Sequence, residues 1–384
     1  MRGRDDSWTF SKPVSFYGSR NNFKCRLANM GKYNFDGHKL AYHPERVSEY
    51  LRSGDCFPLY VEISPVGGCN HRCLFCAYDF IGHPNRRLTT GRLLTILTDM
   101  AACGVKSIVF AGEGEPLLHP DIAVHIAHAK AAGIDIGLFT NGQLLNEALA
   151  IKILPHLSFV RFSFNGGTAQ DYATVHQVAP KVFETVVDHL RQAVILKKSN
   201  GWEVDIGAQF VLIPENKDSL LAAAALLKDA GLDYLAVKPF VHQRSEQFYH
   251  LEDAYDPADL ETLFAQLNAL SDDHFSALVR TDAFMNSGPR TYKECRGCSF
   301  ITVLNSAGDL ASCLPYWDKP EFVFGNIYEA DFRTIWQSHR RKQLQHFLES
   351  TLDVSQCPAN CRPNAINAFL SEISKPSVRH VNFI

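Results

Sequence analysis

The residues most suited to chemistry in this chain lie in one short run, SPVGGCNHRCLFCAYDF, at positions 64–80. Cys69, Cys73 and Cys76 fall within eight positions of one another, just after the apolar, strand-like segment LYVEI. Three thiolates on one tight loop can each bind one iron of a [4Fe–4S] cube, which leaves the fourth iron open. The spacing therefore predicts an iron–sulfur site with one open iron.

Two other features of the run bear on this prediction. Gly67 and Gly68 precede the first cysteine, and glycine lets a backbone approach an inorganic cluster without an intervening side chain. A zinc site is the alternative interpretation, with His71 as the fourth ligand, although this histidine sits between two of the thiols. A third interpretation is a group of buried thiols without metal.

The composition is that of an ordinary globular protein. The chain has 384 residues, 46% of them apolar, and a formal net charge of -3, which gives no electrostatic footprint for nucleic acid or anionic membranes. The N-terminus, MRGRDDSWTF, has no apolar segment typical of a secretory signal. Because eleven cysteines without export should remain reduced, we expect a cytoplasmic protein whose clustered thiols bind metal.

The elements that must position these thiols alternate along the chain. Short β-rich runs are separated by helical stretches, such as one entered at Thr89 or Thr90 and ended by Gly104. The pattern predicts a parallel α/β sheet or an incomplete barrel, in which ligands gather at the carboxyl ends of the strands. The expected strands are 59–64, 107–112, 135–140, 159–164, 204–213 and 234–239.

The run CNHRCLFC resembles the signature of the radical S-adenosylmethionine (radical SAM) superfamily, with Phe75 as its aromatic position. The resemblance implies a partial (β/α)6, TIM-like barrel and two cofactors, a [4Fe–4S] cluster and S-adenosyl-L-methionine. In that family the open iron chelates the methionine part of S-adenosylmethionine. Reductive cleavage then yields a 5′-deoxyadenosyl radical, which removes a hydrogen atom from a substrate.

Other motifs follow in the order that the family would have them. AGEGEP resembles the glycine–glutamate motif that meets the ammonium group of the cofactor, and implies Glu113 and Glu115 in that role. TNG at 140–142 closes the next strand. RFSFNG places Ser163 and Asn165 where relatives contact the ribose or the carboxylate. Each motif read by itself is also compatible with a simple turn or strand end.

A second group of cysteines resembles the SPASM or twitch extension of the same superfamily. Its start is matched by Cys298, which is followed after nine residues by Gly308 and after four more by Cys313. Its end is matched by CPANC at 357–361. A full SPASM extension has seven cysteines for two clusters, whereas this region has five, so one auxiliary [4Fe–4S] cluster and the shorter twitch form are implied. Cys295 also satisfies the spacing to Gly308 and is the alternative to Cys298. The implied ligands are Cys298, Cys313, Cys357 and Cys361; a zinc ribbon is the other interpretation of these thiols.

The predicted organisation has four parts. We expect an N-terminal extension at 1–55, which packs on the rest of the chain, and the radical SAM partial barrel at 56–285. A SPASM/twitch auxiliary-cluster domain at 286–375 and a C-terminal tail at 376–384 complete the chain.

The expected activity is hydrogen abstraction from a small polar metabolite (a sugar, an aminocyclitol or a nucleotide-linked compound), giving oxidation or epimerisation. We infer a small molecule because only about 55 residues precede the barrel, without the pattern of a peptide-recognition domain. The leftover thiol, Cys295, is a candidate hydrogen donor. Lys238 is the leading candidate for a substrate contact, and the other candidates are Glu62, Arg161, His242 and Arg244.

Two other functions stay open at this point. One is a peptide- or protein-modifying radical SAM enzyme, such as an epimerase, a thioether-forming enzyme or a maturase. The other is a non-catalytic iron–sulfur protein that senses redox state or scaffolds clusters. For an enzyme, the expected partner besides the substrate is an electron donor such as flavodoxin or ferredoxin, and neither nucleic acid nor a membrane is expected.

Overall fold

The computed structural model describes residues 32–33, 38–240, 257–280, 283–284, 290–358 and 361–383. Residues 35–384 form one structural unit, and residues 1–34 form another. His242 and Arg244, two of the candidate substrate contacts, lie outside the described residues.

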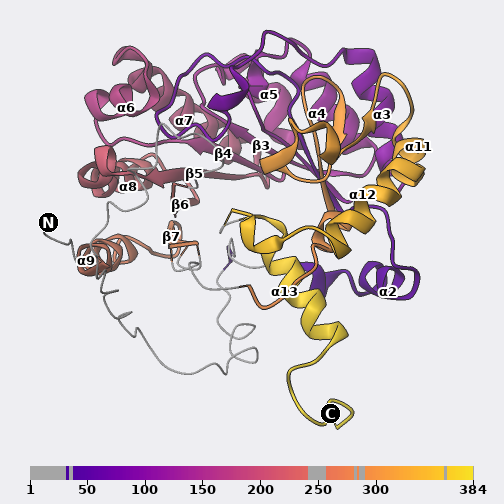
Figure 1. The fold of residues 1–384 in the computed structure, drawn as a ribbon. Coiled ribbons are helices and arrows are strands. Elements are labelled where there is room, and N and C mark those ends of the chain that lie inside the picture. Colours follow the sequence, from indigo (N-terminus) through magenta and orange to yellow (C-terminus); the bar gives the residue numbers. More distant parts are fainter. Residues whose placement is uncertain are drawn as a thin grey trace, which may run out of the picture. The chain divides into compact units, whose positions relative to one another are not determined.

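One sheet holds the ten strands of the described residues together, in the order β10-β9-β8-β1-β2-β3-β4-β5-β6-β7 (Figure 1). From β8 to β7 all neighbours are parallel, whereas β9 and β10 are antiparallel additions beyond β8. The strands are β1 (Tyr60–Ile63), β2 (Ser107–Phe110), β3 (Asp135–Thr140), β4 (Phe159–Ser163), β5 (Asp205–Leu212), β6 (Tyr234–Pro239), β7 (Ser276–Val279), β8 (Ile301–Leu304), β9 (Asp309–Ala311) and β10 (Val323–Asn326).

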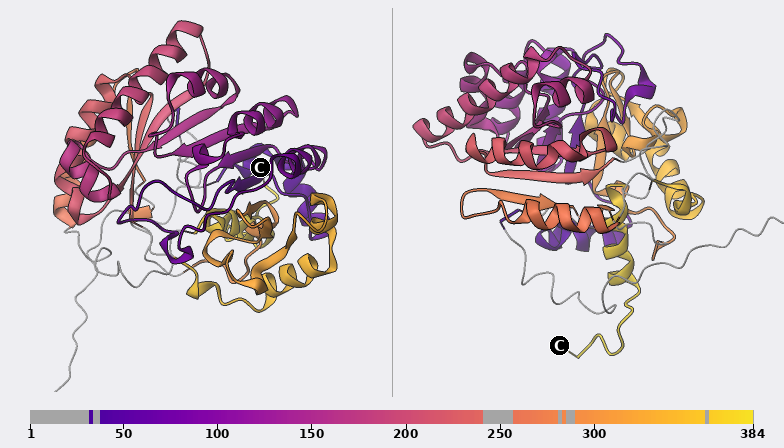
Figure 2. Two further views of the ribbon diagram at one scale, coloured as in Figure 1. Left: turned by 90° about the horizontal axis from the view of Figure 1, so that it is seen from above. Right: turned by 90° about the vertical axis from the view of Figure 1, so that its left-hand side faces the viewer.

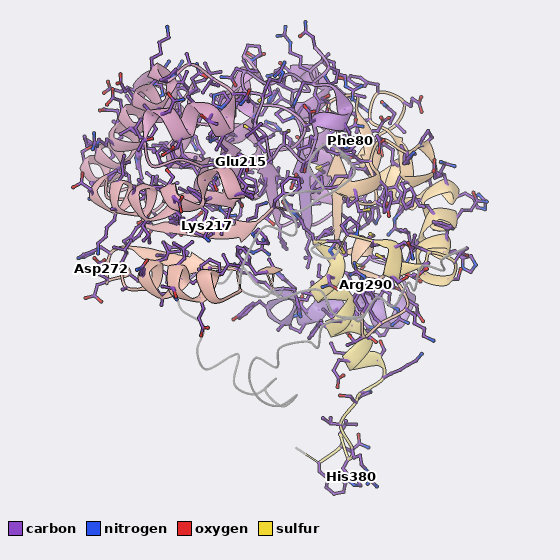
Figure 3. All side chains as sticks on the ribbon, turned by 60° about the vertical axis from the view of Figure 1, so that its left-hand side comes forward. Phe80, Glu215, Lys217, Asp272, Arg290 and His380 are labelled. Atoms are coloured by element: carbon purple, nitrogen blue, oxygen red, sulfur yellow. The ribbon has the colours of Figure 1, made fainter. Side chains whose placement is uncertain are left out.

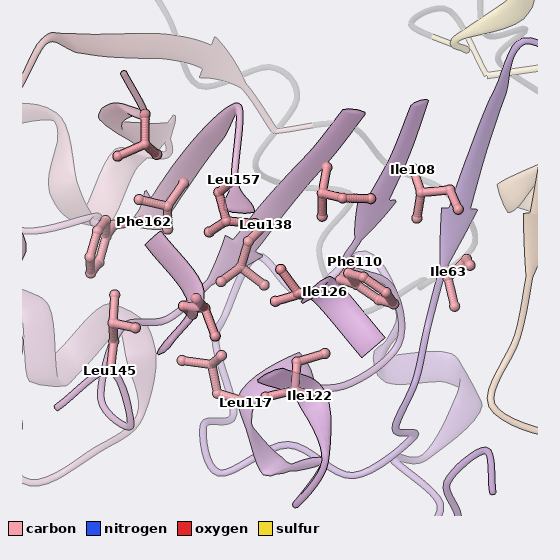
Figure 4. Close-up of a cluster of buried hydrophobic side chains, with 14 of the residues drawn as sticks. Ile63, Ile108, Phe110, Leu117, Ile122, Ile126, Leu138, Leu145, Leu157 and Phe162 are labelled. Carbon is pink, nitrogen blue, oxygen red and sulfur yellow. The ribbon is translucent and has the colours of Figure 1, made fainter. Parts of the chain in front are cut away.

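Helices connect the parallel strands and cover the outer face of the sheet (Figure 2). Alternate side chains of the strands, such as Ile108, Phe110, Leu138 and Phe162, are fully buried against these helices (Figure 4). Burial of each such side chain stabilises the fold by about 1.5–3 kcal/mol. The helices are α2 (Pro44–Ser53), α3 (Thr90–Ala102), α4 (Ile122–Ala131), α5 (Glu147–Ile153), α6 (Ala169–His176), α7 (Lys181–Asn200), α8 (Leu220–Asp229), α9 (Pro257–Asn268), α11 (Phe332–Gln337), α12 (His339–Ser350) and α13 (Pro363–Ser374).

The six expected strands are present in the expected order, which confirms the parallel α/β architecture. Helix α3 begins at Thr90 and is followed by Gly104 with a φ of +80°, but Thr89 makes no side-chain capping bond. Two parallel strands are additional to the prediction. β7 extends one edge, and β8 pairs with β1 on the other, so that the C-terminal region shares the sheet of the barrel.

The described part of the N-terminal extension packs against the C-terminal region. Val47 and Tyr50 of α2 share a buried cluster with Phe300 and with Leu370 of α13. The Tyr50 hydroxyl also donates a hydrogen bond to Glu349 Oε1 at 2.9 Å. Among the described helices, none combines the length and the apolar character that a membrane crossing requires.

Candidate functional site

The loop after β1, residues 64–89, carries the three closely spaced cysteines, and backbone hydrogen bonds hold it at several points. Gly67 N donates to Arg86 O at 2.9 Å, and Leu88 N donates to Pro65 O at 3.0 Å, which closes the base of the loop. Leu74 N donates to the carbonyl of Val175 in α6 at 2.9 Å. The cysteine segment is therefore held against the last turn of α6.

Close packing within this loop and against the loop after β2 explains two glycines. A Cβ atom on Gly114 would lie 2.2 Å from the carbonyl oxygen of Gly68 and 2.5 Å from that of Val66. A Cβ atom on Gly67 would lie 2.6 Å from the carbonyl oxygen of Pro84. Gly68 alone has room, since nothing comes closer than 3.9 Å to its Cβ position. Gly114 thus lets the two loops meet at the carboxyl edge of the sheet, and Gly67 lets the cysteine loop fold closely on itself.

Each of the three thiols is near a nitrogen atom. Cys69 Sγ accepts from the His71 backbone at 3.5 Å, Cys73 Sγ lies 3.4 Å from His176 Nδ1, and Cys76 Sγ lies 3.8 Å from His83 Nε2. Burial raises the pKa of Cys69 and of Cys76 to about 11, and the pKa of Cys73 further, with the neighbouring thiols adding to the effect at Cys73. The three thiols form no disulfide, and without a metal they resist ionisation. They fit a cationic metal centre, because bound iron stabilises thiolates.

A hydrogen-bond chain fixes the tautomer of His176, which sequence reasoning did not single out. Val211 N donates to Asn165 Oδ1 at 2.6 Å, so the amide nitrogen of Asn165 faces His176 Nε2, at 3.1 Å. Burial holds the pKa of His176 well below its usual value, which keeps the ring neutral. Its one N–H therefore lies on Nδ1, which faces both His71 Nδ1 at 3.3 Å and Cys73 Sγ at 3.4 Å.

Phe75 and Asn165, two of the predicted cofactor residues, both contact the ring of His176. Phe75 packs edge-to-face on it at 5.6 Å between ring centroids, and Tyr172 stacks on it at 4.0 Å. Sequence reasoning missed this histidine because it lies on α6 and contacts the cysteine loop only through the fold. Ser163, the last residue of β4, is half-buried and pairs in register with Gln209.

The two glutamates of AGEGEP have different surroundings. Glu115 accepts hydrogen bonds from Thr140 Oγ1 at 2.7 Å and from Asn141 N at 2.8 Å, while burial raises the pKa of its carboxyl group. Glu113 accepts from Ser306 N at 2.8 Å and pairs with Arg86. Glu115 therefore organises the loop after β3, and Glu113 ties the barrel to the turn between β8 and β9.

The five C-terminal cysteines also come together. The β8–β9 hairpin turns at Gly308, and the Cys298 thiol interacts with those of Cys295 and Cys313. Burial raises the pKa of Cys357 to about 11 and that of Cys361 to about 12, and the Cys295 and Cys313 thiols contribute in both cases. Cys295 Sγ lies 3.6 Å from Cys298 Sγ.

Arg290, which is labelled in Figure 3, braces the last two of these cysteines. Its guanidinium donates to the carbonyl oxygens of Cys357 at 3.0 Å and Pro358 at 2.8 Å, and lies 3.7 Å from Cys361 Sγ. A fixed cation beside thiolates favours their ionised form and so suits a second iron–sulfur centre.

Comparison with known sequence families decides the assignment. Residues 63–227 match the radical SAM superfamily, and residues 295–362 match an iron–sulfur cluster-binding domain, SPASM. This is a radical SAM protein with a C-terminal SPASM domain. Its cofactors are accordingly a [4Fe–4S] cluster and S-adenosylmethionine, together with auxiliary iron–sulfur clusters in the SPASM domain.

Relatives of this radical SAM protein have diverse names. It is 26% identical to the tungsten-containing aldehyde ferredoxin oxidoreductase cofactor-modifying protein of Pyrococcus furiosus, over 73% of this chain and 81% of that protein. It is 24% identical to the AdoMet-dependent heme synthase of Methanosarcina barkeri, over 71% and 80%. It is also 28% identical to the S-adenosylmethionine-dependent nucleotide dehydratase of Selenomonas ruminantium, over 46% and 64%.

A solved structure shares the fold over most of this chain. Streptococcus suis SuiB bound to S-adenosylmethionine superimposes with a TM-score of 0.64 at 17% identity, covering 88% of this chain and 79% of SuiB.

The inner face of the radical SAM barrel carries several of the predicted polar residues. Glu62 of β1 forms an ion pair with Arg362, which follows the last cysteine of the SPASM domain. Arg161 of β4 donates from Nε to the Tyr234 hydroxyl at 3.1 Å. Besides burial, the positive charges of Arg362 and Arg161 help to lower the pKa of Lys238 of β6. Glu62, Arg161 and Lys238, three of the predicted substrate contacts, therefore share one charged interior.

Proposed function

We propose that this radical SAM enzyme removes a hydrogen atom from a small polar metabolite, of the sugar, aminocyclitol or nucleotide-linked type, held inside the barrel. The supporting observation is the charged interior that Glu62, Arg161, Lys238 and Arg362 share on the inner side of the sheet. Relatives named for nucleotide substrates, a nucleotide dehydratase and a GTP 3′,8-cyclase, are consistent with this choice.

The residues of this chain have separable tasks in the proposed reaction. Cys69, Cys73 and Cys76 hold the cluster, which supplies the electron that cleaves S-adenosylmethionine when both are bound. Glu115 keeps the loop after β3 in place against the cysteine loop, through its bonds to Thr140 and Asn141. The residues that we assign to the cofactor itself remain Phe75, Glu113, Glu115, Ser163 and Asn165.

For the auxiliary site we favour one [4Fe–4S] cluster held by Cys295, Cys313, Cys357 and Cys361. The thiols of Cys357 and Cys361 interact with Cys295 and Cys313, and the SPASM match begins at Cys295. Cys298 is then the leftover thiol and replaces Cys295 as the candidate hydrogen donor. A donated hydrogen atom gives epimerisation, whereas electron transfer to the auxiliary cluster gives oxidation.

Cleavage of S-adenosylmethionine tests the proposal. The reconstituted protein, kept free of air and reduced with dithionite, should produce 5′-deoxyadenosine, which is measured by liquid chromatography with mass spectrometry. Cys76→Ala should produce none, while Cys103→Ala should match the wild type because Cys103 is buried beyond the end of α3. Iron-loaded protein that leaves S-adenosylmethionine intact would instead favour a non-catalytic iron–sulfur role.

The substrate class and the outcome of the reaction need a second experiment. Candidate sugars, aminocyclitols, nucleotides and peptides are incubated with the protein in heavy water. Solvent deuterium in the product indicates a thiol donor, and an unlabelled product oxidised by two electrons indicates the auxiliary cluster as acceptor. Turnover of peptides alone would favour the peptide-modifying alternative. An electron donor such as flavodoxin or ferredoxin and a cytoplasmic location complete the proposal.

A further inference from the structure

The loop CRGC at 295–298, which carries the first two cysteines of the SPASM domain, lies on the first turns of α13. A Cβ atom on Gly297 would lie 2.9 Å from Pro363 Cβ and 3.2 Å from Asn367 Oδ1. Glycine at this position therefore lets the loop approach the helix closely. Because α13 begins at Pro363, two residues after Cys361, this one helix lies next to both ends of the cysteine group.

The side chain of Asn367 attaches this loop to the helix. It is 2% exposed, and its Oδ1 atom accepts hydrogen bonds from the backbone N–H groups of Arg296 at 2.8 Å and of Gly297 at 2.6 Å. These two donors fix the orientation of the amide group, since a reversed amide would set its NH2 group against two N–H groups. The Nδ2 end of the amide therefore points away from the loop backbone.

The nitrogen end of the amide faces a thiol. Asn367 Nδ2 donates to Cys295 Sγ at 3.5 Å. The amide has a second N–H, and the Tyr292 hydroxyl also interacts with the Asn367 side chain. Because Oδ1 already accepts two hydrogen bonds, Cys295 Sγ meets the amide as an acceptor. A thiolate accepts such a bond far better than a thiol does, and a cysteine that binds a metal is a thiolate.

Cys298, the competing thiol of the same loop, has different surroundings. It is 4% exposed, and its sulfur lies 3.6 Å from Cys295 Sγ and interacts with the thiol of Cys313. Within the described ranges of the chain, no N–H group donates a hydrogen bond to Cys298 Sγ. The amide of Asn367 thus distinguishes the two cysteines by geometry, and it selects Cys295.

We propose that Asn367 is a positioning residue of the auxiliary site, which donates an N–H···S hydrogen bond to the Cys295 thiolate and thereby raises the reduction potential of the auxiliary cluster. The inference rests on the proposed function, which makes Cys295 a cluster ligand. Hydrogen bonds to the sulfurs are among the properties that set such potentials. Reduction adds negative charge to the cluster, so the hydrogen bond is stronger in the reduced form and favours it. A raised potential suits a cluster that accepts an electron from a substrate radical, which is the oxidation outcome.

A redox titration of the auxiliary cluster, followed by electron paramagnetic resonance, tests the proposal. The first cluster is removed by replacing Cys69, Cys73 and Cys76 with alanine, so that one cluster signal remains. Asn367→Ala removes the donor without adding charge, and its reduction should be weakened by about fivefold, the worth of one hydrogen bond. For a one-electron couple this is a fall of about 40 mV in the midpoint potential. Asn367→Asp keeps an acceptor for the loop but turns an oxygen toward Cys295 Sγ, so its potential should fall further.

Asn364→Asp is the matched control for the added charge. Asn364 lies three residues earlier on α13, and its Oδ1 accepts hydrogen bonds from Arg290 at 2.9 Å and from the Tyr292 hydroxyl at 2.8 Å. The substitution places the same charge beside the auxiliary site, next to the Arg290 guanidinium. Because Asn364 donates to no thiol in the part of the chain that the structure describes, its variant should shift the potential by less than Asn367→Asp does.

Three results would overturn the role of Asn367. They are an unchanged or raised potential in Asn367→Ala, equal effects of the two aspartate variants, and loss of the auxiliary irons from both Asn367 variants, since the amide would then only hold the loop. Loss of these irons from Asn367→Asp alone supports the proposal, because a carboxylate that faces Cys295 repels its thiolate.

The protein with all its cysteines is assayed for 5′-deoxyadenosine in parallel. If this product forms but the Asn367 variants leave the potential unchanged, the role of Asn367 is wrong and the proposed function stands. If the potential falls as expected but the wild type forms no 5′-deoxyadenosine, the proposed function fails instead.

Discussion

Replacement of Gly114 by alanine should displace the cysteine loop while the barrel stays folded. The new methyl group would lie 2.2 Å from Gly68 O, against an ordinary carbon–oxygen contact of about 3.2 Å, so one backbone segment must move by about 1 Å. Both obstructing atoms, on Gly68 and Val66, belong to the backbone and cannot rotate away. Gly68 directly precedes Cys69, so the displacement reaches the first thiol.

The magnitude follows from two contributions. Overpacking of this kind costs about 1–3 kcal/mol. The 3.0 Å hydrogen bond from Glu115 N to Gly68 O is stretched as well, at a cost of about 1 kcal/mol. We therefore expect Gly114→Ala to lower the free energy of unfolding by about 3 kcal/mol and to reduce the iron content from about eight to about four per chain.

Urea unfolding of the apoprotein and iron analysis of the reconstituted protein measure these effects. Gly91→Ala is the matched control, since its Cβ position in α3 has nothing within 4 Å. This variant should bind iron normally and gain up to about 1 kcal/mol from helix propensity. A Gly114→Ala protein with full iron content and wild-type stability would refute the packing argument.

Three further predictions concern the thiols and two buried histidines. Cys295→Ser should lose the auxiliary irons and Cys298→Ser should retain them in iron analysis; the reverse result restores Cys298 as the ligand. His176→Phe keeps an aromatic ring stacked on Tyr172 but removes the Nδ1–H that faces Cys73 Sγ and His71 Nδ1. If Cys73 accepts this N–H, the midpoint potential of the first cluster should fall by about 40 mV in a redox titration followed by electron paramagnetic resonance, and an unchanged potential contradicts donation to Cys73. Burial lowers the pKa of His125 to about 4, and its ring nitrogens have no hydrogen-bond partner among the described residues, so its contribution to stability is present above pH 6.5 and lost as the pH falls toward 4. His125→Leu should lose about 2 kcal/mol less than the wild type between pH 8 and pH 5 in urea unfolding, and equal losses would exclude this contribution.

Local sequence patterns were sufficient to predict the six strands from β1 to β6. Each is a nearly continuous apolar run, as a parallel strand that is buried on both faces requires. The strands β7 and β8 were not predicted. Each has only four residues, and the pairing of β8 with β1 joins segments that are about 240 positions apart. Such a pairing depends on the whole fold and leaves no local pattern.

The same limit applies to the site. The cysteines could be identified because the metal dictates their spacing, whereas His176 could not, since its role depends on Asn165 and Val211 from two other segments. Spacing alone could not show whether Cys295 or Cys298 is the cluster ligand, because both fit the distance to Gly308. The electrostatic influence of Cys295 on the pKa of Cys357 and of Cys361 is the basis on which we propose Cys295 as the ligand.

The pairing of β8 with β1 has a consequence for how this protein can be divided. A chain shortened to end before residue 301 would leave the backbone donors and acceptors of β1 without their neighbour along Tyr60–Ile63. Bare edges of this kind recruit other chains and promote aggregation. The two halves should therefore not be interchangeable parts that can be cut apart and recombined with those of relatives, and successful chimeras should keep both strands from a single parent.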